Sequence, residues 1–158
     1  MSAATPLARR LVGELMRHGH TVATAESLTA GLVCAALTDV PGASAVVRGG
    51  LIVYATDLKR SLAGVDPALL AAHGAVHPDV AAQLAEGART RCGADWGLGL
   101  TGVAGPDPQD GVPPGTVYVG VAGAVVRGTR TLQVSGDRDV VRQAAVRGAL
   151  ELLAEQLG

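Results

Sequence analysis

The chain has 158 residues, a formal net charge of −1, and apolar residues at 48% of its positions. Aromatic residues make up only 2% and phenylalanine is absent, so the core must be built from Ala, Val and Leu. A chain of this length forms one domain that buries about 70% of its unfolded surface. The near-neutral charge without dense Lys/Arg runs argues against non-specific nucleic-acid binding. No apolar run approaches membrane-spanning length, so we expect a soluble, cytoplasmic protein with no membrane partner.

Helix and strand signals alternate along the chain. Thr5-Pro6 is an N-cap followed by a first-turn proline, and the apolar spacing that follows predicts a first helix ending near Gly19. The expected elements after it are a strand over 20–25, a helix to about 38, a strand over 45–55, helices over 57–63, 66–74 and 78–91, strands over 95–101, 116–121 and 125–134, and a helix over 138–156. The last two strands flank a Gly-Ala turn and form an antiparallel hairpin. This order predicts a single α/β domain over 1–158, a three-layer α/β/α sandwich with a mixed, mostly parallel sheet including a C-terminal hairpin.

A lone serine lies where the first strand turns into the second helix, in Ala23-Thr-Ala-Glu-Ser-Leu-Thr-Ala-Gly31. The apolar period changes close to Ser27, so we expect this serine at or beside the helix N-cap. Backbone N–H groups and the helix dipole there can stabilise an alkoxide or an oxyanion, and Gly31 allows the close approach of another segment. The alternative is an ordinary capping serine that accepts one backbone hydrogen bond.

A second candidate segment runs from Gly49 to Lys59. Tyr54 lies at the expected end of a strand, and Lys59 follows on a short helix that can fold back across the sheet edge. If Ser27 lies at the same edge, Lys59 can remove its proton as a general base. A solvated lysine has a pKa of about 10.4, so this role near pH 7 needs a downward shift of roughly 3 units. The alternatives are a surface lysine that snorkels and a half-buried strand tyrosine.

The third candidate segment, Thr101-Gly-Val-Ala-Gly-Pro-Asp107, lies just beyond a buried strand, where open α/β sheets bind ligands. Gly102 and Gly105 expose backbone N–H groups that can cradle an anion or line an oxyanion hole, with a plain tight turn as the alternative. The spacing fits neither a Rossmann nor a Walker A motif. At the start of the last helix, Arg138 or Arg142 can clamp a phosphate or belong to a solvated charged face.

Metal ligation is not indicated by the histidines or the cysteines. His73 and His77 have the i, i+4 spacing of a zinc pair, but a glycine and a proline break any helix through them and no third ligand is evident. Cys34 and Cys92 lie far apart without metal-ligand spacing, so we expect small buried hydrophobes in a reducing compartment. We therefore expect no metal.

Four features, in their joint order and spacing, make the chain similar to the C-terminal domain of the competence/damage-inducible protein A (CinA) family. Stand-alone members of that family are known as nicotinamide-nucleotide amidohydrolases. The features are Ala25-Glu-Ser-Leu-Thr-Ala-Gly31; Pro41-Gly-Ala-Ser44 with Gly49-Gly50 and Tyr54-x4-Lys59; Gly74-Ala-Val76 with Pro78-Asp-Val-Ala81; and Thr101-Gly-Val-Ala-Gly-Pro-Asp107 followed by Pro114-Gly-Thr-Val-Tyr118. The resemblance runs from about the first helix to the last.

The resemblance implies a deamidase that converts nicotinamide mononucleotide into nicotinate mononucleotide and ammonia, returning the pyridine ring to NAD synthesis. It implies Ser27 as nucleophile and Lys59 as base, with Tyr54 assisting proton movement or orienting the lysine, and it implies no cofactor. Substrate binding is then assigned to Glu26, Thr29, Gly31, Thr101, Gly102, Gly105 and Arg138. The expected partner is a small-molecule nucleotide substrate, and the high Ala/Val content is compatible with a homo-oligomer.

Several positions depart from the family pattern. Ala30-Gly31 stands where Gly-Gly is common, His77 replaces a serine, and Val112-Pro113 occupies a place that often carries lysine or histidine. These changes leave the Ser-Lys dyad intact and concern substrate contacts. Longer members carry an N-terminal domain that resembles molybdopterin-binding proteins and is linked to nucleotide pyrophosphatase activity; this chain has no room for it, so we expect that chemistry to be absent. Two alternatives stay open, namely a non-catalytic nucleotide-binding or regulatory module and amide hydrolysis on another small substrate.

Overall fold

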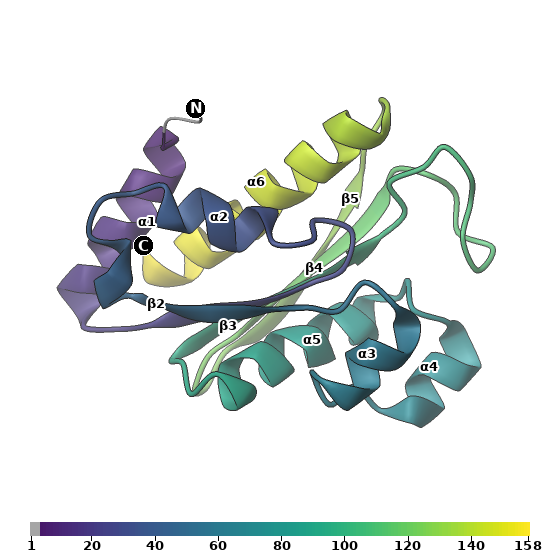
Figure 1. Cartoon of the computed structure of the whole chain (residues 1–158), viewed down its shortest axis with the longest axis horizontal. Coiled ribbons are helices and arrows are strands. Elements are labelled where there is room, and N and C mark those ends of the chain that lie inside the picture. The colour runs from purple at the N-terminus through teal and green to yellow at the C-terminus, as the bar shows by residue number, and fades with distance from the viewer. Residues whose placement is uncertain (1–3) are drawn as a thin grey trace.

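Residues 4–158, which a computed structural model describes, form a five-stranded sheet in the order β2-β1-β3-β4-β5 with helices on both faces. Figure 1 shows α1, α2 and α6 on one face of this sheet and α3, α4 and α5 on the other. The elements are α1 (Pro6–His18), β1 (Val22–Glu26), α2 (Leu32–Thr38), the 3-10 turn η1 (Ala43–Ala45), β2 (Val47–Ile52), α3 (Thr56–Ser61), α4 (Pro67–His73), α5 (Pro78–Arg91), β3 (Trp96–Gly102), β4 (Thr116–Ala122), β5 (Arg127–Gln133) and α6 (Arg138–Leu157). The predicted three-layer α/β architecture is confirmed.

The sheet is mixed, and its strand directions explain where a site can form. β1 runs parallel to both β2 and β3, whereas β4 runs antiparallel to β3 and to β5. Only β4 runs against the other four strands, because it follows β3 without the crossover helix that a parallel neighbour requires, and the sheet is mixed as predicted. The carboxyl ends of β1, β2 and β3 consequently meet at one edge, which is where open α/β sheets place their ligands.

Most helix ends follow the sequence signals. Thr5 accepts a hydrogen bond from the backbone of α1, and the helix ends at Gly19, which has a left-handed φ of 67°. His77 and Asp137 likewise accept hydrogen bonds from the first turns of α5 and α6. Such caps satisfy backbone groups that a helix leaves without partners. Within the described chain, no helix combines the length and apolar character needed to cross a membrane.

The two faces of the sheet carry side chains of very different size. Leu98 and Leu100 of β3 are fully buried in the apolar core beneath α1 and α6. On the other face, Gly97 and Gly99 let α5 lie directly on the sheet, because a Cβ at either position would overlap backbone atoms of that helix. Gly120 of β4 continues this glycine track, with the same overlap. Helix α5 therefore packs closely on this face of the sheet, with no room for side chains at these three positions.

Candidate active site

Ser27 directly follows β1, between the ends of the two neighbouring strands. Its N–H donates to the carbonyl oxygen of Leu100 at 3.1 Å, and the carbonyl oxygen of Glu26 accepts from Val53 N–H at 2.9 Å. The serine is 7% exposed. Backbone hydrogen bonds on both sides thus hold the hydroxyl at the carboxyl edge of the sheet.

The prediction that Ser27 lies at or beside a helix N-cap is wrong. α2 begins only at Leu32, and its N-cap is Gly31, with a left-handed φ of 102°. The capping role belongs instead to the side chain of Glu26, which accepts N–H donors from the start of the helix. The hydroxyl of Ser27 is consequently not used to cap α2.

Glu26 is a buried carboxylate whose oxygens are saturated with donors. It is 1% exposed and accepts the hydroxyls of Thr24 and Thr29, each at 2.8 Å. Three backbone donors complete the set, the N–H groups of Gly31, Val33 and Cys34 at 2.9–3.1 Å. Buried carboxylates are tolerated when they are hydrogen-bonded in this way. Glu26 therefore folds the turn after Ser27 and has no oxygen free for a ligand.

Lys59 lies in α3 and reaches back to Ser27. It is 1% exposed, and its Nζ lies 2.9 Å from the Oγ of Ser27. Two backbone carbonyl oxygens complete its surroundings, that of Val53 at 2.9 Å and that of Tyr54 at 3.1 Å. The structure thus brings together the serine and the lysine that the sequence singled out.

The protonation state of Lys59 decides what this contact can do. Burial lowers the pKa of the amine from 10.5 to about 8, because the charged form loses its hydration. In the neutral amine, two N–H groups serve the two carbonyl oxygens, and the nitrogen lone pair is left for the hydroxyl proton of Ser27. At pH 7 a group with a pKa near 8 is neutral in about one molecule in ten. The pair can therefore generate a serine nucleophile.

Asp110 acts on Lys59 through its charge. Its negative charge raises the pKa of Lys59 and opposes part of the burial effect. The Asp110 carboxylate accepts the N–H of Ala75 at 3.3 Å, with a φ of 50° at Asp110 itself. Sequence reasoning missed this residue, since the only signal was an acidic residue before a glycine in a long loop.

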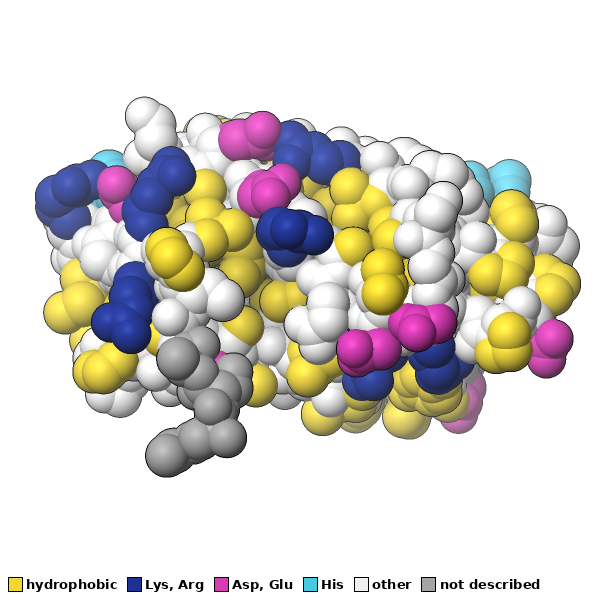
Figure 2. Space-filling model, turned by 90° about the horizontal axis from the view of Figure 1, so that it is seen from above, with side chains coloured by type: hydrophobic (Ala, Val, Ile, Leu, Met, Phe, Trp, Pro, Cys, Tyr) yellow, Lys and Arg dark blue, Asp and Glu magenta, His cyan; other side chains and the backbone are white. Residues whose placement is uncertain are grey.

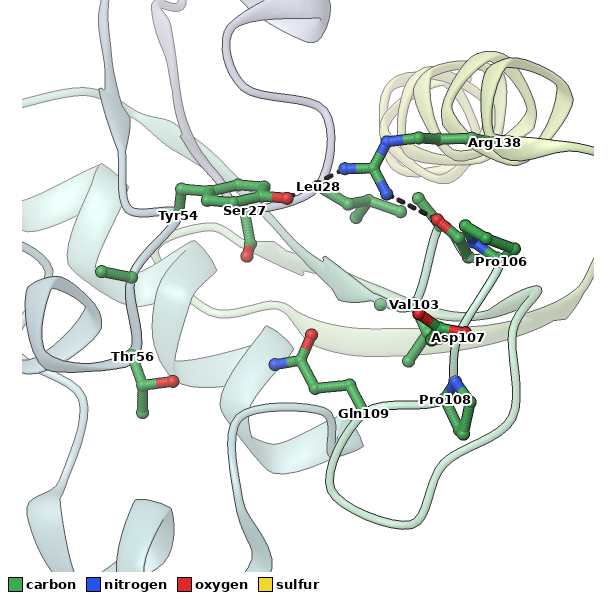
Figure 3. A pocket seen from close by; sticks show the side chains of 14 residues that line it. Ser27, Leu28, Tyr54, Thr56, Val103, Pro106, Asp107, Pro108, Gln109 and Arg138 are labelled. Carbon is green, nitrogen blue, oxygen red and sulfur yellow. Dashed lines mark hydrogen bonds between the residues drawn. The ribbon is translucent and has the colours of Figure 1, made fainter.

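The side chain of Tyr54 faces Arg138 rather than Lys59. Its phenol oxygen accepts from Arg138 at 2.9 Å, and the tyrosine is 58% exposed. The same guanidinium donates to the carbonyl oxygen of Gly105 at 2.6 Å. Arg138 therefore links the segment after β2 with the loop after β3, and Figure 3 shows both contacts. Tyr54 meets Lys59 through its main-chain carbonyl.

A pocket of about 570 Å³ opens in front of Ser27. This volume lies within the roughly 300–1,000 Å³ usual for small-molecule sites. Its walls come from the turn after β1, the segment 54–56, the loop 102–109 and the first residue of α6. Leu28, Ala104 and Gly105 are among the lining residues, and within residues 4–158 none of their backbone N–H groups donates to a protein acceptor. Such donors suit the negative oxygen of a tetrahedral intermediate.

The assigned substrate-binding residues divide between the pocket and the core. Gly102, Gly105 and Arg138 line the pocket, together with Ser27 and Tyr54. The others lie outside its lining: Glu26 and Thr29 bond each other, Gly31 caps α2, and Thr101 donates to the carbonyl oxygen of Ala75 at 2.8 Å. These four residues therefore contribute to the site only by holding the chain next to the pocket in place. Asp107 and Gln109 line the pocket but were not assigned, because a loop sequence does not reveal which side chains face inward.

The histidines and cysteines show no ligand arrangement. His73 and His77 stack with their ring centroids 4.4 Å apart, and Nδ1 of His77 accepts from the start of α5. Across residues 4–158 no three His, Cys, Asp or Glu side chains are grouped as a metal site would require. Cys34 and Cys92 are half-buried free thiols rather than fully buried ones, and burial raises the pKa of each.

A second cavity, of about 750 Å³, lies between α1, α2 and α6. Figure 2 looks onto the face that carries these helices and shows hydrophobic side chains interspersed with charged ones of both signs. Its apolar lining includes Leu7, Leu32 and Leu150, with Arg147 and Glu151 beside them. It contains none of the residues that surround Ser27.

Comparisons with known proteins agree on one family. The profile of the CinA C-terminal domain matches residues 4–157. A CinA-like protein of Frankia casuarinae is 50% identical over 147 residues, covering 93% of this chain and 34% of that protein. A putative competence-damage inducible protein of Geobacillus kaustophilus is 46% identical over 147 residues, covering 90% and 35%. The chain therefore spans about a third of the length of these relatives.

Solved structures match over almost the whole chain. The competence/damage inducible protein CihA from Agrobacterium tumefaciens has a TM-score of 0.93 at 36% identity, with 98% of both chains covered. The competence or damage-inducible protein from Enterobacter asburiae has a TM-score of 0.94 at 30% identity, with both chains fully covered.

Proposed function

Because the chain belongs to the family of CinA C-terminal domains, we propose that it is an amidohydrolase that uses Ser27 and Lys59 to deamidate nicotinamide mononucleotide. The observation that carries this proposal is the 2.9 Å contact between two buried groups, the Ser27 hydroxyl and the Lys59 amine. A lysine whose pKa is lowered to about 8 can accept the serine proton, whereas a solvated lysine would remain charged.

The reaction begins when the Oγ of Ser27 attacks the carboxamide carbon and neutral Lys59 takes the hydroxyl proton. The carbonyl oxygen becomes negative and is held by backbone N–H groups such as those of Leu28 and Gly105. The C–N bond then breaks, and the Lys59 ammonium returns its proton to the departing nitrogen, which leaves as ammonia. An acyl ester on Ser27 remains.

Water completes the cycle by attacking this ester. Lys59, neutral again, takes a proton from the water and delivers it to the Oγ of Ser27 as the ester bond breaks. The products are the nicotinate ribotide and the free serine. Every proton transfer in both halves uses the same nitrogen, which is held by the carbonyl oxygens of Val53 and Tyr54.

The presence of Arg138 in the pocket supports the proposal that the substrate carries a phosphate group. It is one of two charged side chains that line the pocket within the described residues, the other being Asp107. Its guanidinium has five N–H donors, of which two bonds to Gly105 and Tyr54 use only part. The remaining donors suit phosphate oxygens, which guanidinium groups bind in a planar, bidentate manner.

Ammonia release from nicotinamide mononucleotide tests the proposal. We expect the wild-type protein to form one nicotinate mononucleotide per ammonia, and Ser27→Ala and Lys59→Met each to reduce the rate by at least about 10³-fold. Ser44→Ala, in η1 and outside this pocket, is the matched control and should retain full activity. Binding of the nucleotide by the wild type without ammonia release would instead support a non-catalytic nucleotide-binding module. A panel of other small amides would detect a different substrate.

A further inference from the structure

We propose that Gln109 selects primary carboxamides, by pairing its side-chain amide with the amide edge of the substrate, and that it disfavours the carboxylate product. This inference rests on the proposed amidohydrolase function and concerns the substrate class of the same pocket. Gln109 lines the pocket with Ser27. Figure 3 shows its side chain reaching from the loop after β3 into the pocket, with the amide group on the side of Ser27.

The backbone around Gln109 is fixed, although its side chain is free. Its N–H donates to the carbonyl oxygen of Val112 at 3.1 Å, and the N–H of Val112 donates back at 2.8 Å. The next residue, Asp110, fastens the loop to the N–H of Ala75. In the described chain no protein group hydrogen-bonds to the amide of Gln109, so both of its polar atoms are available to a ligand.

Amide chemistry makes this side chain complementary to one functional group. Gln109 offers the Oε1 acceptor and the Nε2 donors side by side. A primary carboxamide presents a carbonyl oxygen and an N–H on the same edge, so two hydrogen bonds form at once. The Nε2 donor also strengthens its bond as the carbonyl oxygen becomes negative during attack by Ser27.

The same edge rejects two close analogues. In a secondary amide the favoured trans arrangement places the N-substituent beside the carbonyl oxygen, where the N–H must be. The product carboxylate replaces that N–H with a negative oxygen facing Oε1 of Gln109, so two acceptors meet. A site built to hydrogen-bond one group discriminates strongly against analogues that leave its polar atoms unpaired. Gln109 thus favours substrate entry and product release.

Gln109→Leu separates recognition from chemistry. We expect kcat/KM for nicotinamide mononucleotide to fall about 10- to 100-fold, the effect of losing two hydrogen bonds. The inhibition constant of nicotinate mononucleotide should stay unchanged or decrease. The factor by which the protein prefers the amide substrate to the acid product should therefore become smaller. In the wild type, the N-methylcarboxamide ribotide should be a far poorer substrate, and Gln109→Leu should reduce that difference. Gln143→Leu on α6, away from this pocket, is the matched control.

The outcomes distinguish this inference from the proposed function. An active wild type whose preferences are unchanged in Gln109→Leu overturns the role of Gln109 and leaves the amidohydrolase proposal standing. An equal loss of affinity for amide and acid also overturns it, because the side chain would then only shape the pocket. If the wild type releases ammonia from no primary amide tested, both proposals fail together.

Discussion

The two walls of the pocket are built in different ways. On the sheet side, Ser27 and Lys59 are 7% and 1% exposed, and Lys59 contacts both the Ser27 hydroxyl and the backbone carbonyl oxygens of Val53 and Tyr54. On the loop side, Asp107 and Gln109 are exposed, and their segment is fastened mainly through Asp110 and Arg138. The difference teaches that the proposed reacting groups belong to the core, whereas the residues proposed to recognise the ligand lie on a loop, where sequence can change at little cost to folding.

The largest effect on stability is expected on the sheet side, from Glu26→Gln. The variant loses the charge that five donors surround, and its own NH₂ group faces some of those donors. We expect the free energy of unfolding to fall by about 2–4 kcal/mol in urea denaturation, with a lower kcat as the turn after Ser27 loosens. The exposed Glu151→Gln should change stability by less than about 0.5 kcal/mol. If Glu26→Gln and Glu151→Gln had equal stability, the claim that buried contacts such as those of Glu26 hold the sheet side of the pocket together would be contradicted.

An intermediate effect is expected from Arg138→Leu on the recognition side. Hydrogen bonds to a charged group contribute about 1.5–3 kcal/mol, so KM for the nucleotide should rise about 10- to 100-fold. The kcat should change much less, because Arg138 does not touch Ser27 or Lys59 in the structure. Steady-state kinetics check this, with Arg147→Leu on the outer side of α6 as the control. A fall in kcat at constant KM would show that Arg138 belongs with the reacting groups.

The smallest expected effect is a shift in the pH profile, caused by the charge of Asp110 on the loop side acting on Lys59 on the sheet side. Since Lys59 must be neutral, kcat/KM should rise about tenfold per pH unit below its pKa of about 8 and level off above it. Asp110→Asn removes the charge that raises this pKa, so the midpoint should move to lower pH while Ala75 keeps an acceptor. A midpoint that moves upward would contradict the assigned electrostatics. Asp39→Asn, at the end of α2, serves as the control.

The lowered pKa also links stability to pH. The amine has a pKa near 10.5 in the unfolded chain and about 8 in the folded one, so between these values the unfolded chain binds more protons. The contribution of Lys59 to the free energy of unfolding therefore rises with pH across this window. Below pH 8 the buried charge lowers stability by its full amount. Holding Lys59 in the core thus carries a folding cost at and below pH 8.

Much of the fold could be predicted from local signals. Proline and capping residues marked α1 and α5 correctly, and the hairpin of β4 and β5 followed from its turn. The start of α2 could not be found, because a side chain five residues before Gly31 takes over its capping. The two segments made a contact between Ser27 and Lys59 conditional on a shared sheet edge, the family resemblance paired the two residues, and the structure shows the contact. The sequence did not predict that the side chain of Gln109 points into the pocket. That direction depends on contacts between its loop and residues distant in the sequence.

The glycine track on β3 and β4 has a practical consequence for redesign. Any side chain introduced at Gly97, Gly99 or Gly120 would push α5 away from the sheet. These positions therefore cannot be used to add new functional groups. A redesign of the proposed amidase for other amides should therefore vary the exposed pocket residues 107–109 and keep these strand glycines. Such variants would change the lining of the pocket without disturbing the packing of α5 on the sheet.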